Sequence, residues 1–198
     1  MAKRQSSLQD IFEKNRYDYT IVNKSKTWFE QQANLLAGKG LTPQRLLGQA
    51  KSDLTMTLMP GNLYMFFYDP KYKETLPYYD RFPLVFPYKK YKGGFIGLNM
   101  HYLPYGPRVK LMDRLMQFKN NDKMDETTRL KFSWALIDGV SKFAMAKPCI
   151  KQYLTDHMES PFIHINPKDW PTAMMLPVER FVGSNKQTVW QESIKKSY

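Results

Sequence analysis

The chain of 198 residues carries 30 lysine and arginine residues against 18 aspartate and glutamate residues, a formal net charge of +12. A hydrophobic fraction of 42% and an aromatic fraction of 15% exclude a chain that is disordered throughout. No apolar run exceeds about six residues, far short of the roughly 20 that a bilayer span needs, and no secretory signal is expected at the N-terminus.

The excess positive charge is spread along the chain and is not held in a basic tail, so a folded surface must display it. Such a potential is typical of a protein that meets nucleic acid or an acidic protein partner. The alternative is that the charge serves solubility alone. The single cysteine, Cys149, excludes an internal disulfide bond and gives no indication of a zinc site.

Three short helices are predicted in the first 57 residues, which we interpret as a helical N-terminal arm. One follows Ser7, where apolar residues recur at helical spacing. Another begins near Thr27, which has capping-box spacing to a glutamate. The third has Thr42 as its N-cap and Pro43 at its first helical position.

An aromatic sheet is predicted next. About half of the aromatic residues of the chain lie between Asn62 and Tyr105, and this composition favours half-buried strands. We predict strands at residues 63–68, 82–86 and 95–102, the last two joined by a turn in which Gly93 and Gly94 supply the positive φ angles. The fold class is therefore predicted to be α+β, with a small antiparallel aromatic-rich sheet that is either open or closed into a small barrel.

The third predicted strand has an alternation that defines its buried face. Ile96, Leu98, Met100 and Tyr102 share one face and are predicted to pack on a helix that begins at Pro107. The opposite face carries Phe95, Gly97, Asn99 and His101.

The C-terminal half is predicted to be mainly helical. Asp125 is expected to cap a long helix, and Pro148 to open a short one. Residues 162–165 alternate like a further strand, and Ser184 has capping-box spacing at the start of a basic C-terminal helix. The predicted organisation is an arm (residues 1–57), an α+β core domain (residues 58–183) and a C-terminal basic helix (residues 184–198).

The search for catalytic residues gives little. None of the three histidines has the paired helical spacing of a zinc site, although Asp156, His157 and Glu159 form a weak candidate cluster. Asp80, Asn99 and His101 could act together, but a hydrogen-bonded structural role is the plainer interpretation. Cys149 either is a reactive thiol at a helix start or, by the simpler interpretation, is a small buried apolar residue. We therefore predict no enzyme, no catalytic residue, no metal and no cofactor.

Cationic and tyrosine side chains gather in the connections of the predicted sheet. We interpret them as a surface that binds a polyanion or an acidic partner. The candidate residues are Lys71, Lys73, Lys89, Lys90, Lys92, Tyr78, Tyr79 and Tyr91.

Four strings carry a family resemblance: YDPKYKETLPYYDRFPLVFP, GFIGLNMHYLP, KPCIKQYL and LPVERF. Across residues 58–182 the chain resembles small virion or DNA-packaging proteins of large T-even-like contractile-tailed bacteriophages. The resemblance implies non-enzymatic assembly work, as a DNA end protector or as a minor component of the neck or baseplate. It supplies no catalytic residues.

The leading hypothesis is a basic structural protein of a tailed-phage particle that contacts the genome end, or its conduit, at the head, neck or tail. The second hypothesis is a purely protein-binding baseplate or neck subunit, and a weaker third is a phage nuclease. The expected partners are other virion proteins and double-stranded DNA, with oligomers in the particle and no membrane. The expected location is the virion, and the host cytoplasm during assembly.

Overall fold

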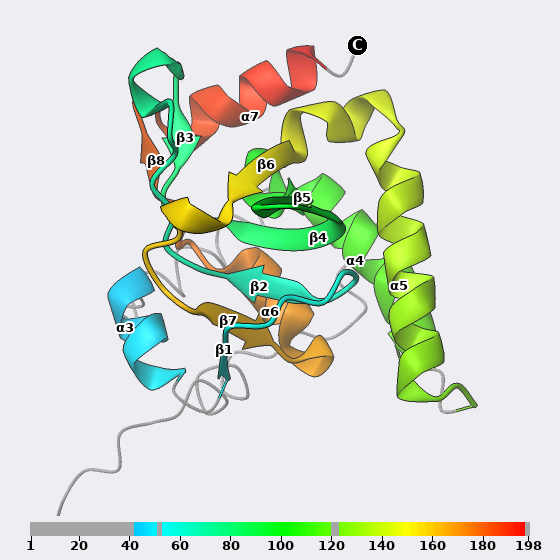
Figure 1. Ribbon diagram of the computed structural model, residues 1–198. Coiled ribbons are helices and arrows are strands. Elements are labelled where there is room, and N and C mark those ends of the chain that lie inside the picture. The colour runs from blue at the N-terminus through cyan, green and yellow to red at the C-terminus, as the bar shows by residue number, and fades with distance from the viewer. Residues whose placement is uncertain (1–41, 51–52, 120–122, 197–198) are drawn as a thin grey trace, which may run out of the picture.

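The computed structural model describes residues 42–50, 53–119 and 123–196 (Figure 1). These residues form a six-stranded antiparallel sheet in the order β1-β7-β2-β4-β5-β6. The strands are β1 (Leu54–Thr55), β2 (Leu63–Met65), β4 (Leu84–Tyr91), β5 (Gly94–Asn99), β6 (Ile150–Leu154) and β7 (Phe162–Ile165). Because β1 and β6 remain as edges, the sheet is open, and of the two predicted forms the closed barrel is excluded.

A second, two-stranded sheet pairs β3 (Tyr79–Asp80) with β8 (Phe181–Val182). The α-helices are α3 (Pro43–Gln49), α4 (Tyr105–Lys119), α5 (Glu126–Ser141), α6 (Trp170–Met175) and α7 (Lys186–Lys195). Figure 1 shows β3, β8 and α7 together at one end of the molecule, with α3 and β1 at the other. The predicted α+β class is confirmed.

Two predicted helix caps are confirmed. Thr42 Oγ1 accepts a hydrogen bond from the backbone N–H of Arg45 at 3.2 Å, and Pro43 is the first residue of α3. Asp125 Oδ1 accepts from the backbone N–H of Thr128 at 3.0 Å at the start of α5. The predicted helices after Ser7 and from Thr27 lie outside the described residues.

The strand boundaries differ from the prediction in three places. Strand β2 ends at Met65. Strand β4 continues through an irregularity between Pro87 and Lys89 as far as Tyr91, so only Gly93, and not Gly94, has a positive φ angle. Strand β5 stops at Asn99 because the Asn99 side chain accepts from the backbone N–H of His101 at 3.0 Å, which starts the 3₁₀ turn η3 (Met100–Tyr102).

Three helix starts were predicted wrongly. Helix α4 begins at Tyr105, ahead of Pro107. Pro148 opens no α-helix: it lies in the 3₁₀ segment η4 (Ala144–Cys149), and the residues after it form strand β6 on the free edge of β5. Asn185, not Ser184, caps α7, since its Oδ1 accepts from the backbone N–H of Thr188 at 3.0 Å.

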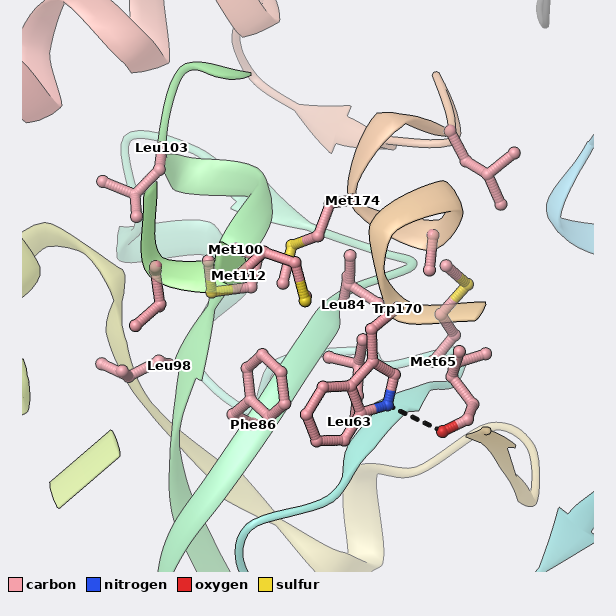
Figure 2. Close-up of a cluster of buried hydrophobic side chains, with 14 of the residues drawn as sticks. Leu63, Met65, Leu84, Phe86, Leu98, Met100, Leu103, Met112, Trp170 and Met174 are labelled. Carbon is pink, nitrogen blue, oxygen red and sulfur yellow. Dashed lines mark hydrogen bonds between the residues drawn. The ribbon is translucent and has the colours of Figure 1, made fainter. Parts of the chain in front are cut away.

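The main core lies on one face of the large sheet and includes residues of α4 and α6 (Figure 2). As predicted, Leu98, Met100 and Tyr102 are buried there, whereas Ile96 is only half-buried and lies outside the cluster. Trp170 packs edge-on against Phe86 and donates its indole N–H to a backbone carbonyl of β7 at 2.9 Å. The buried indole is thus both packed and hydrogen-bonded.

The opposite face of the sheet carries a separate aromatic cluster. Its rings meet edge-on or stacked at centroid distances of 5.0–6.4 Å. They belong to Tyr64, Phe66, Tyr68, Phe95, Tyr153 and Phe162. Strand alternation explains this double burial, because every second residue of β2 and β5 faces away from the main core.

Replacing Leu98 with alanine is expected to lower the free energy of unfolding by about 2–5 kcal/mol, since it empties a site in the main core where the side chain is 1% exposed. Urea titration followed by tryptophan fluorescence measures the change. Leu76, which is 42% exposed in the loop before β3, provides a leucine-to-alanine control with a much smaller expected effect. Equal stability of the Leu98 variant and the wild type would contradict the strand register.

Candidate functional site

A cavity of about 500 Å³ lies between the loop that precedes β3 and strand β6. This volume falls within the range of about 300–1,000 Å³ that is usual for small-ligand sites. Tyrosines dominate the lining, and we call the cavity the tyrosine pocket. They are Tyr68, Tyr72, Tyr78, Tyr79, Tyr102 and Tyr153.

Lys151 extends along one wall of this pocket. It lies on β6 opposite Gly97, and its Nζ is 3.9 Å from the centre of the Tyr102 ring. Burial, together with the nearby positive charge of Lys196, lowers the pKa of the Lys151 ammonium to about 8. No carboxylate of the described residues pairs with it. The pocket therefore holds a partly desolvated cation that lies over an aromatic ring.

The floor of the pocket is a buried polar network around Asp80. His101 Nδ1 lies 2.7 Å from Asp80 Oδ2, and Asn99 Nδ2 donates to the same oxygen at 3.1 Å. Burial by itself raises the pKa of Asp80, but His101 and the hydrogen bonds outweigh burial and hold it below its usual value. A charged carboxylate only accepts, so His101 Nδ1 carries the proton of that hydrogen bond.

The three residues that sequence analysis grouped thus do lie together, and their arrangement is structural. Asp80 Oδ1 also accepts from the backbone N–H groups of Phe82 and Arg180, at 3.1 and 3.2 Å. His101 and Asn99 are 0% and 1% exposed. The network fixes β3 and β8 to the end of β5 and leaves the carboxylate fully engaged.

A second buried ion pair supports the same region. Arg108 is 0% exposed and donates to Glu179 Oε1 at 2.9 Å. Its other donors reach the backbone carbonyls of Leu103, Met174 and His101 at 2.6–3.1 Å. Burial raises the pKa of Glu179, but Arg108, together with other nearby positive charges and a backbone hydrogen bond, outweighs burial and holds the pKa below its usual value. Glu179 of the LPVERF string therefore has a structural role, as the buried partner of Arg108.

Helix α7 contacts the pocket residue Tyr78. Tyr78 donates its hydroxyl to Glu192 Oε2 at 2.9 Å, and burial together with this carboxylate raises the pKa of Tyr78 to about 12. Glu192 also pairs with Lys196 at 3.7 Å. Tyr72, another lining residue, is 64% exposed, and the Lys71 ammonium lies 5.4 Å from its ring centre.

Apart from Lys71, which lines the pocket, the predicted lysines divide into two groups. Lys73 pairs with Asp69 at 2.8 Å, so its charge is neutralised locally. Lys89, Lys90 and Lys92, here called the hairpin lysines, are exposed at the tip of the β4–β5 hairpin. Within the described part of the chain none of them forms an ion pair. The first two lie in β4 itself, and not in the connection as predicted.

The hairpin tip and the tyrosine pocket share strand β6. Tyr91 donates its hydroxyl to the backbone carbonyl of Tyr153 at 3.0 Å, and Gly94 pairs with Leu154, which lines the pocket. Tyr78 and Tyr79 line the pocket itself. The structure thus brings the predicted tyrosines close to β6, while the hairpin lysines stand two strands away from it.

Sequence analysis missed Lys151, Tyr102 and Tyr153 as site residues. The first and last were assigned to a helix, which would have pointed them in different directions. Residues 150–154 show no alternation of apolar and polar side chains, so the sequence offered no local signal for a strand there.

The remaining catalytic candidates gain no support from their surroundings. Burial raises the pKa of the Cys149 thiol to about 12, which contradicts a reactive thiolate. His157 Nδ1 lies 2.9 Å from the backbone carbonyl of Asp69. Among the described residues, no three histidine, cysteine or acidic side chains are grouped to hold a metal ion. No helix in the described ranges is long and apolar enough to cross a membrane.

Comparison with known proteins identifies the family. The family model described as "Phage T4 terminal DNA protecting protein" matches residues 4–197. No curated protein and no solved structure matches the chain. The family match extends over nearly the whole chain and confirms the resemblance to T-even-like phage proteins. The chain belongs to the family of phage T4 terminal DNA protecting proteins.

Proposed function

We propose that this protein binds the ends of linear double-stranded DNA in a T4-like phage and shields them from exonucleases without cleaving DNA itself. The observation that carries the proposal is the family match over residues 4–197, because the family is described by the protection of terminal DNA. The net charge of +12 supports it, since contacts with phosphates dominate the affinity of proteins for DNA.

The hairpin lysines supply a surface suited to the DNA backbone. Their side chains are exposed and have no ion-pair partner in the described ranges, so binding phosphate breaks no salt bridge there. Exposed lysines at a hairpin tip contact phosphates without reading bases. That behaviour suits a protein that must hold an end whatever its sequence.

The same proposal includes the location of the protein. It is carried in the virion at the genome end, near the head and neck, and joins the DNA in the host cytoplasm during assembly. If the protein stays on the packaged DNA, it protects the genome ends both during assembly and in the next infected cell. Mass spectrometry of purified particles, before and after nuclease treatment of opened heads, measures whether the protein is present and whether DNA retains it.

The direct test is protection of a blunt linear duplex from a processive exonuclease by the full-length protein. We expect the linear duplex to survive, and no cleavage of linear or supercoiled DNA with magnesium or manganese present. A Lys89→Ala/Lys90→Ala/Lys92→Ala variant is expected to weaken binding and to reduce the slope of log affinity against log salt by about three units, one for each lost phosphate contact.

The matched control removes the same charge elsewhere. Lys110, Lys131 and Lys147 are exposed in α4, α5 and η4, and their triple alanine variant should keep most of the affinity. Loss of protection in both triple variants would show that binding depends on net charge alone. Unchanged salt slopes in both would exclude a contribution of the hairpin lysines to DNA binding. Cleavage by the wild type would favour a nuclease instead.

A second candidate function, binding to another virion protein, has one specific observation in its favour. Trp134 and Phe143, in α5 and just after it, are 42% and 65% exposed. Large aromatic side chains are typical of the centres of protein interfaces. Binding to a virion protein through them would persist at high salt, whereas binding to DNA would not.

A further inference from the structure

A protein that protects DNA ends must distinguish an end from continuous duplex. Two chemical features exist at an end and nowhere else along an intact duplex. The terminal base pair has one face with no stacking partner, and a terminal phosphate monoester carries nearly two negative charges where an internal diester carries one. A site that recognises ends therefore needs an aromatic surface for a base and a cation for the extra charge.

The tyrosine pocket offers both. Its lining includes the rings of Tyr72, Tyr78 and Tyr79, which are exposed or half-buried and on which a base of any sequence can stack. Its wall carries the ammonium of Lys151, which is half-buried and has no carboxylate partner in the described residues. The volume of about 500 Å³ is in the range that holds a small ligand.

We propose that the tyrosine pocket takes the terminal nucleotide of one DNA strand, separated from its partner, with its base against the tyrosine rings and its terminal phosphate at Lys151. This inference rests on the proposed binding of DNA ends and adds the site and the chemistry of recognition. The base leaves the duplex at low cost because a terminal pair stacks on one side only.

The geometry of the sheet supports this placement. Lys90 lies two strands from Tyr153, or about 10 Å at the usual strand spacing. This distance corresponds to about three base steps of 3.4 Å. A terminal nucleotide in the pocket therefore leaves the following phosphates of the same strand within reach of the hairpin lysines.

The acidic groups near the pocket are already engaged in hydrogen bonds or ion pairs, so they repel a bound phosphate only weakly. Asp80 is engaged in the hydrogen bonds described above, two of them from backbone N–H groups. Glu192 accepts from Tyr78 and pairs with Lys196. Lys71 in the pocket lining and Lys196 near Lys151 add positive charge, whereas the Cys149 thiol is neutral at pH 7.

The test measures binding of duplexes closed by a hairpin at one end and labelled there, by fluorescence anisotropy. The open end carries a 5′-phosphate, a 3′-phosphate or no phosphate, with the terminal base paired or mismatched. We expect the full-length wild type to prefer one phosphorylated end by about tenfold, and a mismatched terminal pair to strengthen binding severalfold. The two phosphate positions show which strand enters the pocket.

Lys151→Met keeps the aliphatic stem and removes the charge, and is expected to abolish the preference for phosphate while binding the unphosphorylated end as the wild type does. Lys131→Met, an equal charge change on α5, should keep the preference. Tyr72→Ala should reduce the gain from a mismatched end, since Tyr72 is exposed at the pocket. A thermal unfolding curve verifies that each variant is folded.

The pH dependence provides an independent readout. The pKa of Lys151 is about 8, so the phosphate preference should decline between pH 7 and pH 9, as Lys151 loses its proton. Contacts from ordinary surface lysines, which titrate near about 10.4, should hardly change over that interval. A preference that is constant from pH 7 to pH 9, or that survives in Lys151→Met, would overturn the inference.

The failures of the two proposals can be distinguished. A duplex sealed by hairpins at both ends serves as the reference without an end. Equal binding of open and sealed duplexes would refute the proposed function. A preference for open duplexes that depends neither on the terminal phosphate nor on Lys151 would retain that function and refute the tyrosine pocket as its site.

Discussion

Replacing Arg108 with methionine is expected to lower the free energy of unfolding by about 3–5 kcal/mol. The change removes one partner of a buried ion pair and leaves Glu179, whose side chain is 3% exposed, as an uncompensated charge. It also leaves the carbonyls of Leu103, His101 and Met174 without the guanidinium donors they now have. Methionine keeps only the aliphatic stem, so the contacts of the guanidinium with the rings of Tyr105 and Trp190, at 4.9 and 5.3 Å, are lost as well.

The measurement is urea unfolding at pH 7, with Arg81→Met as the matched control. Arg81 forms an ion pair with Glu159 at 3.0 Å, but its side chain is 48% exposed, so its loss should cost about 1 kcal/mol or less. An Arg108→Met/Glu179→Leu double variant should recover part of the stability, because it removes both charges. Equal costs for Arg108→Met and Arg81→Met would contradict the structural role of the buried pair.

Features determined by neighbouring residues were predictable from the sequence. The caps Thr42 and Asp125 were identified correctly because each accepts from a backbone N–H three residues ahead. The alternation that buries Leu98 is equally local. The α+β class followed from the mixture of such signals.

Features determined by distant residues were not predictable. Residues 150–154 form a strand because β5, more than fifty residues earlier, has a free edge for them, and no local pattern excluded a helix there. The prediction that Met100 and Tyr102 continue the strand was wrong because the Asn99 side chain turns the backbone. Ser184 and Asn185 are adjacent potential caps, and spacing alone favoured the wrong one.

The candidate site shows the same division. The tyrosines and lysines of the loop before β3 and of the β4–β5 hairpin were identified from composition, and their role in binding stays a prediction. Lys151 and Tyr102 were missed because their proximity, 3.9 Å from ammonium to ring centre, arises only when β6 pairs with β5. The spacing of residues along the sequence gives no signal for a cation that only the tertiary structure places among aromatic rings.

Replacing Asp80 with asparagine is expected to cost about 3–5 kcal/mol at pH 7, since it removes the charged partner of His101 inside the protein. The substituted amide also presents N–H groups where Asp80 now accepts hydrogen bonds from Asn99 and from two backbone N–H groups. Asp138→Asn, which affects an exposed pair with Lys142, should cost about 1 kcal/mol or less.

The pH dependence of stability identifies the charge as the cause. The folded pKa of Asp80 lies below its unfolded value of about 3.9, so the unfolded chain binds more protons between these two values. The contribution of Asp80 is therefore complete above about pH 5 and is lost as the pH falls through the folded pKa. Between pH 7 and pH 3, the free energy of unfolding, measured with urea, should decline less in Asp80→Asn than in the wild type. The decline that remains in the variant is due in part to Glu179, whose pKa is lowered too. Parallel pH profiles for the two proteins would mean that Asp80 is not held charged by His101 and would remove the electrostatic account of the pocket floor.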